Sequence, residues 1–110
     1  MFVYVSGDCM PVDEELREMA RYFYTIKDIR RLRILVALAE DGEMTVTQLA
    51  HTLHISQPLV SFHLRPLRLL DLVQVRRAGR EVYCSVNLPE IQHRHVELVK
   101  MLTEAVSSGD

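Results

Sequence analysis

MTVTQLAHTLHISQPLVSFHLRPLRLLDLVQVRRAGREVYCSV, residues 44–86, is the stretch that decides the fold of this chain. Its first part predicts a short helix. Thr45 and Gln48 have the spacing of a capping box, in which each side chain satisfies a backbone donor of the first turn. One face of this helix should be buried, because apolar residues recur at helical spacing: Val46, Leu49, Ala50 and Leu53.

A second helix is predicted after a tight turn. Ser56 is a good N-cap, and Pro58 is tolerated in the first turn, where its missing N–H would be unpaired anyway. An inner stripe holds Val60, Leu64 and Leu67, with His63 beside it. The opposite face is small, polar and cationic, with Gln57, Pro58, Ser61, Arg65 and Arg68. Such a face suits the DNA major groove, where Gln reads adenine and Arg reads guanine or holds phosphate. A solvated helix face is the alternative interpretation.

Pro66 lies inside this second helix, where it removes a bond to the carbonyl of Phe62 and clashes with that turn. We therefore expect a bend or an early break near Arg65, which leaves the position of Arg68 open. Gln57 and Ser61 sit near enough to the helix start to reach base edges, and Arg65 is at the limit of reach.

A β-hairpin is predicted next. Val73 and Val75 alternate with polar neighbours, and so do three residues of the return strand, Val82, Cys84 and Val86. Between the strands, Gly79 is free to take a positive φ in the turn. Arg76, Arg77 and Arg80 should then crowd the tip, where they would grip phosphates or enter the minor groove. The predicted fold is mainly α with a small β-hairpin: a winged helix-turn-helix.

The charges are unevenly distributed. Residues 44–80 hold five arginines and one acid, Asp71, whereas the remainder carries eight basic and fourteen acidic residues. A basic segment on an acidic body is typical of a nucleic-acid-binding protein. A length of 110 residues fits one domain, and no apolar run approaches the ~20 residues that span a bilayer. We expect a cytoplasmic protein with no membrane partner.

Flanking helices surround this motif. Before it, an apolar stripe holds Leu16, Met19, Ala20, Phe23 and Ile26, and the helix from Asp28 to Ala39 carries Ile29, Leu32, Leu35, Val36 and Ala39. After it, a stripe holds Ile91, Leu98, Val99, Leu102 and Ala105. We expect the first and last helices to pair with those of a second copy through Leu16, Met19, Phe23, Ile91, His95, Leu98 and Leu102. The alternative is that both pack on their own domain. The predicted boundaries are a flexible tail over 1–10, the domain over 11–106 and a tail over 107–110.

The pattern resembles the ArsR/SmtB family of bacterial winged-helix repressors. The similarity lies in Asp28–Leu35, in Leu49–Leu64 with its Ser-Gln-Pro and Ser-x-His-Leu motifs, and in Leu72-Val73 and Gly79–Tyr83. The resemblance implies a homodimeric repressor that binds operator DNA and is often released by an inducer. It also implies DNA-facing roles for Ser56, Gln57, Ser61 and Arg65, with Arg77 and Arg80 in the wing.

Many members of that family sense metals, and the usual ligands are missing here. Thr45 and Thr47 stand where a Cys-x-Cys would be needed, and hydroxyls do not replace thiolates on soft metals. A second family site, on the last helix, would fall on Leu88, Glu90, Met101 and Glu104, which offer only two oxygen ligands. We predict no metal and no cofactor, and the inducer remains open.

The sequence leaves room for functions other than DNA binding. No nucleophile-and-base arrangement or phosphate-binding glycine loop is present, so an enzyme is not expected. A winged helix that docks on another protein is the main alternative. A thiol-responsive repressor using Cys9 or Cys84 is another, although Cys84 should face the core and nothing cationic adjoins Cys9 in sequence. The operator, the regulated genes and the direction of regulation are not determined by these residues.

Overall fold

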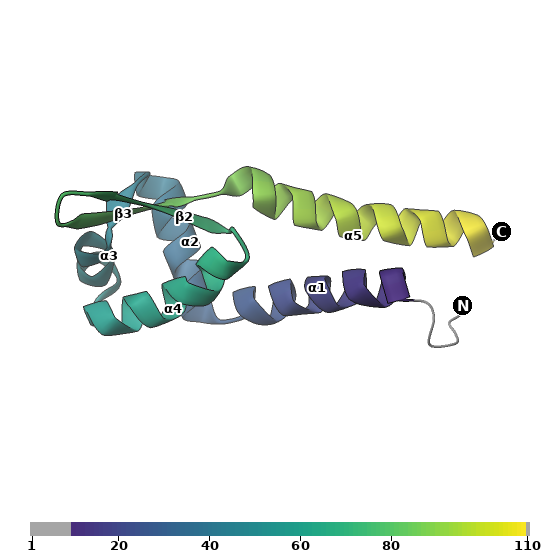
Figure 1. Ribbon diagram of the computed structural model, residues 1–110, viewed down its shortest axis with the longest axis horizontal. Coiled ribbons are helices and arrows are strands. Elements are labelled where there is room, and N and C mark those ends of the chain that lie inside the picture. Colours follow the sequence, from purple (N-terminus) through teal and green to yellow (C-terminus); the bar gives the residue numbers. More distant parts are fainter. Residues whose placement is uncertain (1–9, 110) are drawn as a thin grey trace.

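The computed structural model describes residues 10–109, with side chains from Asp13 onward, and it is elongated, with extents of 54 × 25 × 24 Å. Of the predicted tail over 1–10, residues 1–9 lie outside the described residues, and Met10 is the first residue of α1. Along the chain come α1 (Met10–Ile26), α2 (Ile29–Asp41), β1 (Met44–Thr45), α3 (Val46–Leu53), α4 (Gln57–Leu69), β2 (Val73–Ala78), β3 (Glu81–Val86) and α5 (Leu88–Gly109). Helices α2 to α4 and the hairpin form one end of the molecule, and α1 and α5 extend together from it (Figure 1).

The sheet has three strands, one more than the hairpin that the sequence predicts. Its order is β1-β3-β2 with antiparallel neighbours, and β1 contributes only the pairs Met44↔Cys84 and Thr45↔Tyr83. Thr45 therefore ends the short strand and also caps α3. Its hydroxyl accepts from the Gln48 backbone N–H at 3.0 Å, and the Gln48 side chain accepts from the Thr45 N–H at 2.8 Å. The predicted capping box is confirmed.

The core lies where α2, α3, α4 and the sheet meet. Val60, Leu64 and Leu67 of α4 are buried as predicted, together with Leu49 and Ala50 of α3. The predicted stripe of α2 is wrong in its phase. The buried residues of α2 are Ile34, Ala37 and Leu38, whereas Ile29, Leu32 and Val36 are exposed.

Helix α4 is continuous through Pro66 and ends at Leu69. The predicted early break near Arg65 is therefore wrong. Leu67 and Leu70, on either side of the helix end, are both buried in the core. Their burial holds the last turn helical and offsets the one backbone bond that Pro66 cannot make. Arg68 consequently keeps its helical position on the same exposed face as Ser61 and Arg65.

Helices α1 and α5 are joined to each other and to the domain by a few polar contacts. The Tyr22 hydroxyl and His95 Nε2 are 2.6 Å apart, and the ring of Tyr22 is 99% buried. Arg94 Nη2 donates to the carbonyl of Leu70, the residue that caps α4, at 2.9 Å. Helix α5 runs to Gly109, three residues past the domain end predicted at 106. Within residues 10–109, no helix is long and apolar enough to cross a membrane.

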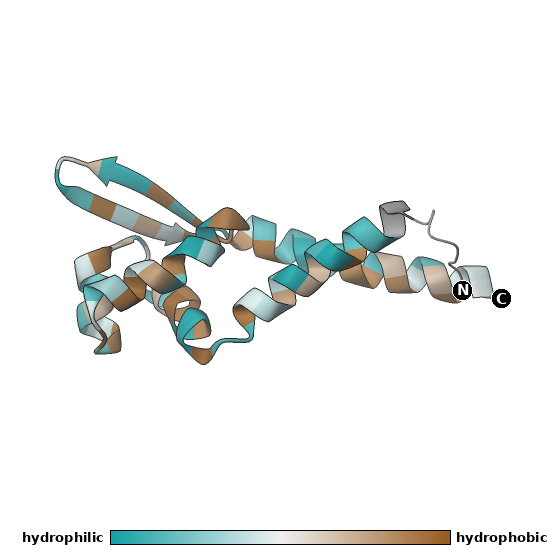
Figure 2. Cartoon of the chain, turned by 60° about the horizontal axis from the view of Figure 1, so that its bottom comes forward, coloured by the Kyte–Doolittle hydropathy of each residue, from teal (hydrophilic) through white to brown (hydrophobic). Residues whose placement is uncertain are grey.

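Both terminal helices leave apolar side chains exposed. No residue of α5 is buried, and Val99, Leu102 and Val106 keep 55–70% of their surface accessible. On α1, Leu16 and Phe23 are exposed, while Tyr22 and Thr25, which the predicted stripe omits, are buried. Figure 2 shows hydrophobic segments recurring along both helices beyond the compact end. Within residues 13–109, these apolar side chains of α1 and α5 are therefore open to solvent.

Candidate nucleic-acid interface

The turn between α3 and α4 fixes where the second helix begins. His54 has a φ of 59°, and its N–H bonds the last carbonyls of α3, which stops that helix. Ser56 then accepts from the Leu59 N–H through its hydroxyl at 3.3 Å, as predicted for an N-cap. Pro58 lies in the first turn of α4. The two helices of the motif are thus set by local capping at both ends of the turn, through the backbone of His54 and the side chain of Ser56.

The predicted reading face of α4 is open. Ser56, Gln57, Pro58, Ser61, Arg65 and Arg68 are all exposed, and none belongs to the core. A groove runs between this face and the hairpin, and its cationic and polar lining comes from Ser61, Arg65, Arg68 and Arg77. The geometry presents a ridge of small and basic side chains beside a second basic element. This arrangement can receive a polyanion.

The hairpin directs its arginines to different sides. Arg77 pairs with Val82 and shares a face with Val75 and Cys84, the face that looks onto α4. Gly79 has a φ of 63°, as the predicted turn requires, and Arg80 stands next to it between the strands. Arg77 and Arg80 therefore lie at the wing as predicted, and both are exposed.

Arg76 is not at the tip, and the prediction that it joins Arg77 and Arg80 there is wrong. It lies mid-strand on the other face of β2, where it pairs with Tyr83. Its Nε and Nη2 donate to the two carboxylate oxygens of Glu43, both at 2.8 Å, and its guanidinium stacks 4.4 Å from the Tyr83 ring centroid. The hydrogen bond from Arg76 holds the pKa of Glu43 below its usual range. Arg76 anchors the wing to the segment before β1, a role that the sequence analysis missed.

Beneath α4, a buried histidine meets an arginine from α2. His63 is 97% buried, and its Nδ1 accepts from Arg31 Nε at 3.1 Å. Arg31 Nη1 also donates to the carbonyl of Thr25 at 3.4 Å. Burial lowers the pKa of His63, and the Asp28 carboxylate partly opposes that shift. Within the part of the chain that the structure describes, His63 Nε2 has no hydrogen-bond partner.

Cys84 is fully buried in β3, as its alternation with Val82 and Val86 predicts. Burial raises the pKa of its thiol, although the positive charge of Arg68 opposes this. A protonated, enclosed thiol is a poor nucleophile. Cys9 lies outside the described residues.

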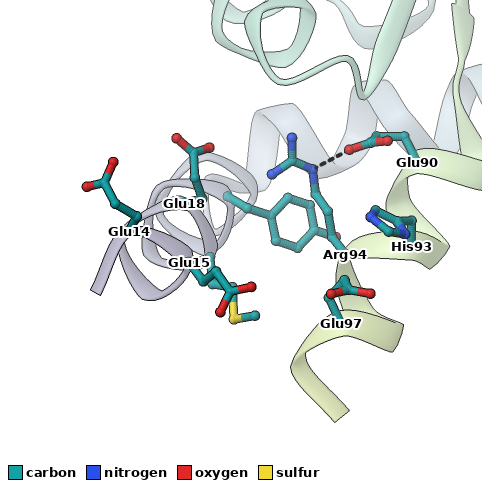
Figure 3. Close-up of a pocket in the computed structure, with 9 residues that line it drawn as sticks. Glu14, Glu15, Glu18, Glu90, His93, Arg94 and Glu97 are labelled. Carbon is teal, nitrogen blue, oxygen red and sulfur yellow. Dashed lines mark ion pairs between the residues drawn. The ribbon is translucent and has the colours of Figure 1, made fainter. Parts of the chain in front are cut away.

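A second hollow lies between α1 and α5, far from the reading face (Figure 3). Arg94 points into it from α5 and pairs with Glu90 at 3.0 Å, next to the ring of Tyr22. Its lining is mostly acidic: Glu14, Glu15, Glu18, Met19, Tyr22, Glu90, His93, Arg94 and Glu97. The molecule is thus basic at the hairpin end and acidic along the terminal helices, which orients it toward a polyanion.

The positions of the two family metal sites have other contacts in this chain. The Thr45 hydroxyl is buried and engaged in the cap of α3, and Glu90 is paired with Arg94. Among the residues that the structure describes, no three His, Cys, Asp or Glu side chains converge as a metal site would require.

Comparison with known proteins identifies the family. The model described as "Bacterial regulatory protein, arsR family" matches residues 28–75, which include α2, the helix-turn-helix and the start of the wing. A "Transcriptional repressor SmtB homolog" of Synechocystis is 36% identical over 101 residues, covering 92% of this chain and 75% of that protein. The chain belongs to the ArsR family.

Two further relatives agree with this. The "Arsenic resistance transcriptional regulator ArsR1" of Pseudomonas putida is 34% identical over 76% of this chain and 64% of its own length. The solved structure of an "ArsR-like Transcriptional Regulator" from Rhodococcus has a TM-score of 0.75 at 25% identity, covering 84% of this chain and 87% of that one. The winged helix-turn-helix fold is confirmed, and the protein is a DNA-binding transcriptional regulator, not an enzyme.

Proposed function

We propose that this ArsR-family regulator acts as a homodimer that represses transcription from a palindromic operator. Ser56, Gln57, Ser61 and Arg65 would contact bases and nearby phosphates in the major groove, and Arg68, Arg77 and Arg80 would contact the backbone. The observation that carries the proposal is the open ridge on α4, with a basic groove between it and the wing. Such a ridge matches a helix that enters the major groove while a wing lies beside it.

The dimer is inferred from the open apolar surface of the terminal helices. Both helices expose apolar side chains: Leu16 and Phe23 on α1, and Val99, Leu102 and Val106 on α5. Apolar side chains that face water in this way add no stability to an isolated helix. A two-fold dimer would cover these faces and place two copies of α4 on successive turns of one duplex. Of the predicted contact residues, Leu16, Phe23 and Leu102 point outward, whereas Ile91 packs on the core of its own chain.

The inducer is proposed not to be a metal at either usual family site, since the needed thiolates and imidazoles are replaced. A thiol switch at Cys84 is disfavoured by its complete burial. A winged helix that docks on a protein is the remaining alternative, but three arginines on the groove between α4 and the wing favour a polyanion over an apolar partner.

Selection of bound duplexes from a random pool tests the proposal. The full chain is expected to enrich an inverted repeat whose half-sites lie about one helical turn apart or a multiple of it. Parallel selections with zinc and with an oxidant reveal whether either releases DNA. Recovery of no sequence at low salt, or affinity that is unaffected by salt, contradicts the proposal and favours the protein-docking alternative.

Base reading is tested on the selected operator with Gln57→Ala and Ser61→Ala. Each variant is expected to lose about 1–3 kcal/mol of discrimination between operator and random DNA, because a good base contact is worth that much. Thr52→Ala, an exposed change on α3, is the control. Retained discrimination in both variants would mean that another face reads the sequence.

A further inference from the structure

The ridge formed by Ser61 and Arg65 has a hollow on each side. One hollow, of about 520 Å³, lies toward the hairpin and is also lined by Arg68 and Arg77. The other, of about 450 Å³, lies on the opposite side of α4, where its lining is Arg31, Pro58, Ser61, Phe62, Arg65 and Pro66.

From these two hollows we infer that Arg31 is a second phosphate-binding residue, which holds the DNA strand on the side of α4 away from the wing. This inference rests on the proposed function. The major groove is about 12 Å wide and is bordered by two sugar-phosphate backbones. A helix that enters it therefore meets phosphates on both flanks. The wing supplies the cations for the phosphates on one flank of α4. Helix α2 supplies Arg31 for the phosphates on the other flank.

Arg31 is held in place for such a contact. Its Nε donates to His63 Nδ1 at 3.1 Å and its Nη1 to the Thr25 carbonyl at 3.4 Å, so two bonds from different helices fix the guanidinium plane. An arginine oriented in advance loses less side-chain entropy when it binds a phosphate. Arg31 is half-buried and lines the hollow, and within residues 13–109 its guanidinium forms no salt bridge.

His63 is then a positioning residue. Because its Nδ1 accepts from Arg31, its proton sits on Nε2, which is buried without a partner. A buried donor without a partner destabilises the fold. The bond to Arg31 gives this histidine a function that an apolar side chain could not supply. The neighbouring acid, Asp28, directs its carboxylate to the backbone N–H groups of Arg30 and Arg31 as the cap of α2.

Phe62 completes the hollow. It is 63% exposed, and its ring packs edge-on against His63, with 5.3 Å between the centroids. An aromatic ring at the outer face of a reading helix offers an apolar contact to deoxyribose or to a thymine methyl group. The hollow thus presents two cations, Arg31 and Arg65, and one apolar surface, which are the two kinds of contact that a nucleotide backbone takes.

Salt dependence of operator binding tests the role of Arg31. In the dimer, Arg31→Gln removes two phosphate contacts, so the slope of log affinity against log salt should fall by roughly 1.8. Affinity should drop about tenfold or more at moderate salt, and equally for operator and random DNA. Arg33→Gln, an exposed change on the same helix that removes the same charge, should leave the slope nearly unchanged.

A structural role would give a different result. If Arg31→Gln lowers affinity without changing the slope, or leaves both unchanged while the protein stays folded, the inference is overturned. Arg31→Lys, which keeps the charge but not the Nε donor, should retain most of the slope. Wild-type protein that binds no DNA at all would instead contradict the proposed function.

The contact of Arg31 with phosphate can be tested even if Arg31→Gln does not fold. Single phosphates of the operator are replaced, one at a time, by neutral methylphosphonates, and the loss of affinity is measured. For wild-type protein, two groups of sensitive phosphates are expected per half-site, one on each border of the major groove. Arg77→Ala should weaken the sensitivity of the group on the wing side, whereas Arg31→Lys, which keeps the charge, should retain most of the sensitivity of both groups. A single sensitive group on the wing side would refute a second contact.

Discussion

The two ends of this molecule differ in how completely they are packed. Among residues 13–109, fourteen apolar residues are buried in the core, and all but Tyr22 belong to the hairpin end. Along α1 and α5, the acidic residues gather and apolar side chains stay in water. The hairpin end is folded by its own core, whereas the terminal helices carry apolar surface that we propose a second copy buries. Reading DNA and pairing copies are therefore separable tasks.

The largest effect is expected from a charge placed in the proposed pairing surface. In Leu102→Glu, each dimer would bury two unpaired carboxylates, and an uncompensated buried charge costs about 3–5 kcal/mol. The dimer dissociation constant should rise by at least about 100-fold. Sedimentation should show a monomer, and operator affinity should collapse, while the hairpin end stays folded.

Ser108→Glu, which adds the same charge near the end of α5, is the matched control and should remain a dimer. A Leu102→Glu protein that still sediments as a dimer would place the pairing surface elsewhere.

A smaller effect, confined to DNA binding, is expected at the wing. Arg77→Ala with Arg80→Ala removes four phosphate contacts per dimer, so the salt slope should fall by roughly 3.6 and affinity by about 10–100-fold at moderate salt. The loss should be similar for all sequences, and the oligomeric state should not change. Titrations of labelled duplexes at several salt concentrations measure both quantities.

The control for the wing carries the same change in charge on α1. Arg17→Ala with Arg21→Ala removes two exposed arginines that pair with Glu14 and Glu18. This variant should keep the wild-type slope. An unchanged slope in the wing variant would remove the wing from the mechanism.

The smallest effect is expected from the titration of His63. Its folded-state pKa lies below the ordinary value near 6.5 because of burial, so the unfolded chain takes up a proton first as pH falls. Stability is therefore constant above that value, declines as pH drops from about 6.5 toward the lowered pKa, and levels off below it. Urea unfolding at intervals between about pH 7.5 and pH 5 measures the decline.

His63→Gln keeps an acceptor for Arg31 but does not titrate, so its stability should vary less over that interval. His93→Gln, an exposed change on α5, should follow the wild type. If His63→Gln shows the full wild-type decline, another group causes it.

Features specified by neighbouring residues were predictable from the sequence. The capping box of Thr45 and Gln48, the Ser56 cap and the buried stripe of α4 all depend on spacings of three or four residues. Strand alternation likewise placed Cys84 in the core and Gly79 in a turn of positive φ. The reading face follows from the same helical period, so its exposure could also be predicted.

Features decided by distant segments were not predictable. Arg76 and Arg77 are neighbours of the same type in sequence. Glu43, which lies 33 residues before Arg76, forms its salt bridge with Arg76 and not with Arg77. Tyr22 belongs to the core cluster, and its hydroxyl meets His95, which lies 73 residues later. The strand β1 consists of two residues and exists only because β3 pairs with it. The local sequence pattern specifies which helices and strands form, and long-range contacts determine which of their side chains are buried or paired.

The bond from Arg94 to the carbonyl of Leu70 has a mechanical consequence. It joins the helix proposed to hold two copies together to the residue at which the reading helix stops. A rotation or slide of α5 must either pull that carbonyl with it or break the bond. A change in the proposed contact between the two copies would therefore alter the spacing of their two α4 helices. The affinity for the DNA duplex would then change, although the altered contact lies far from the DNA.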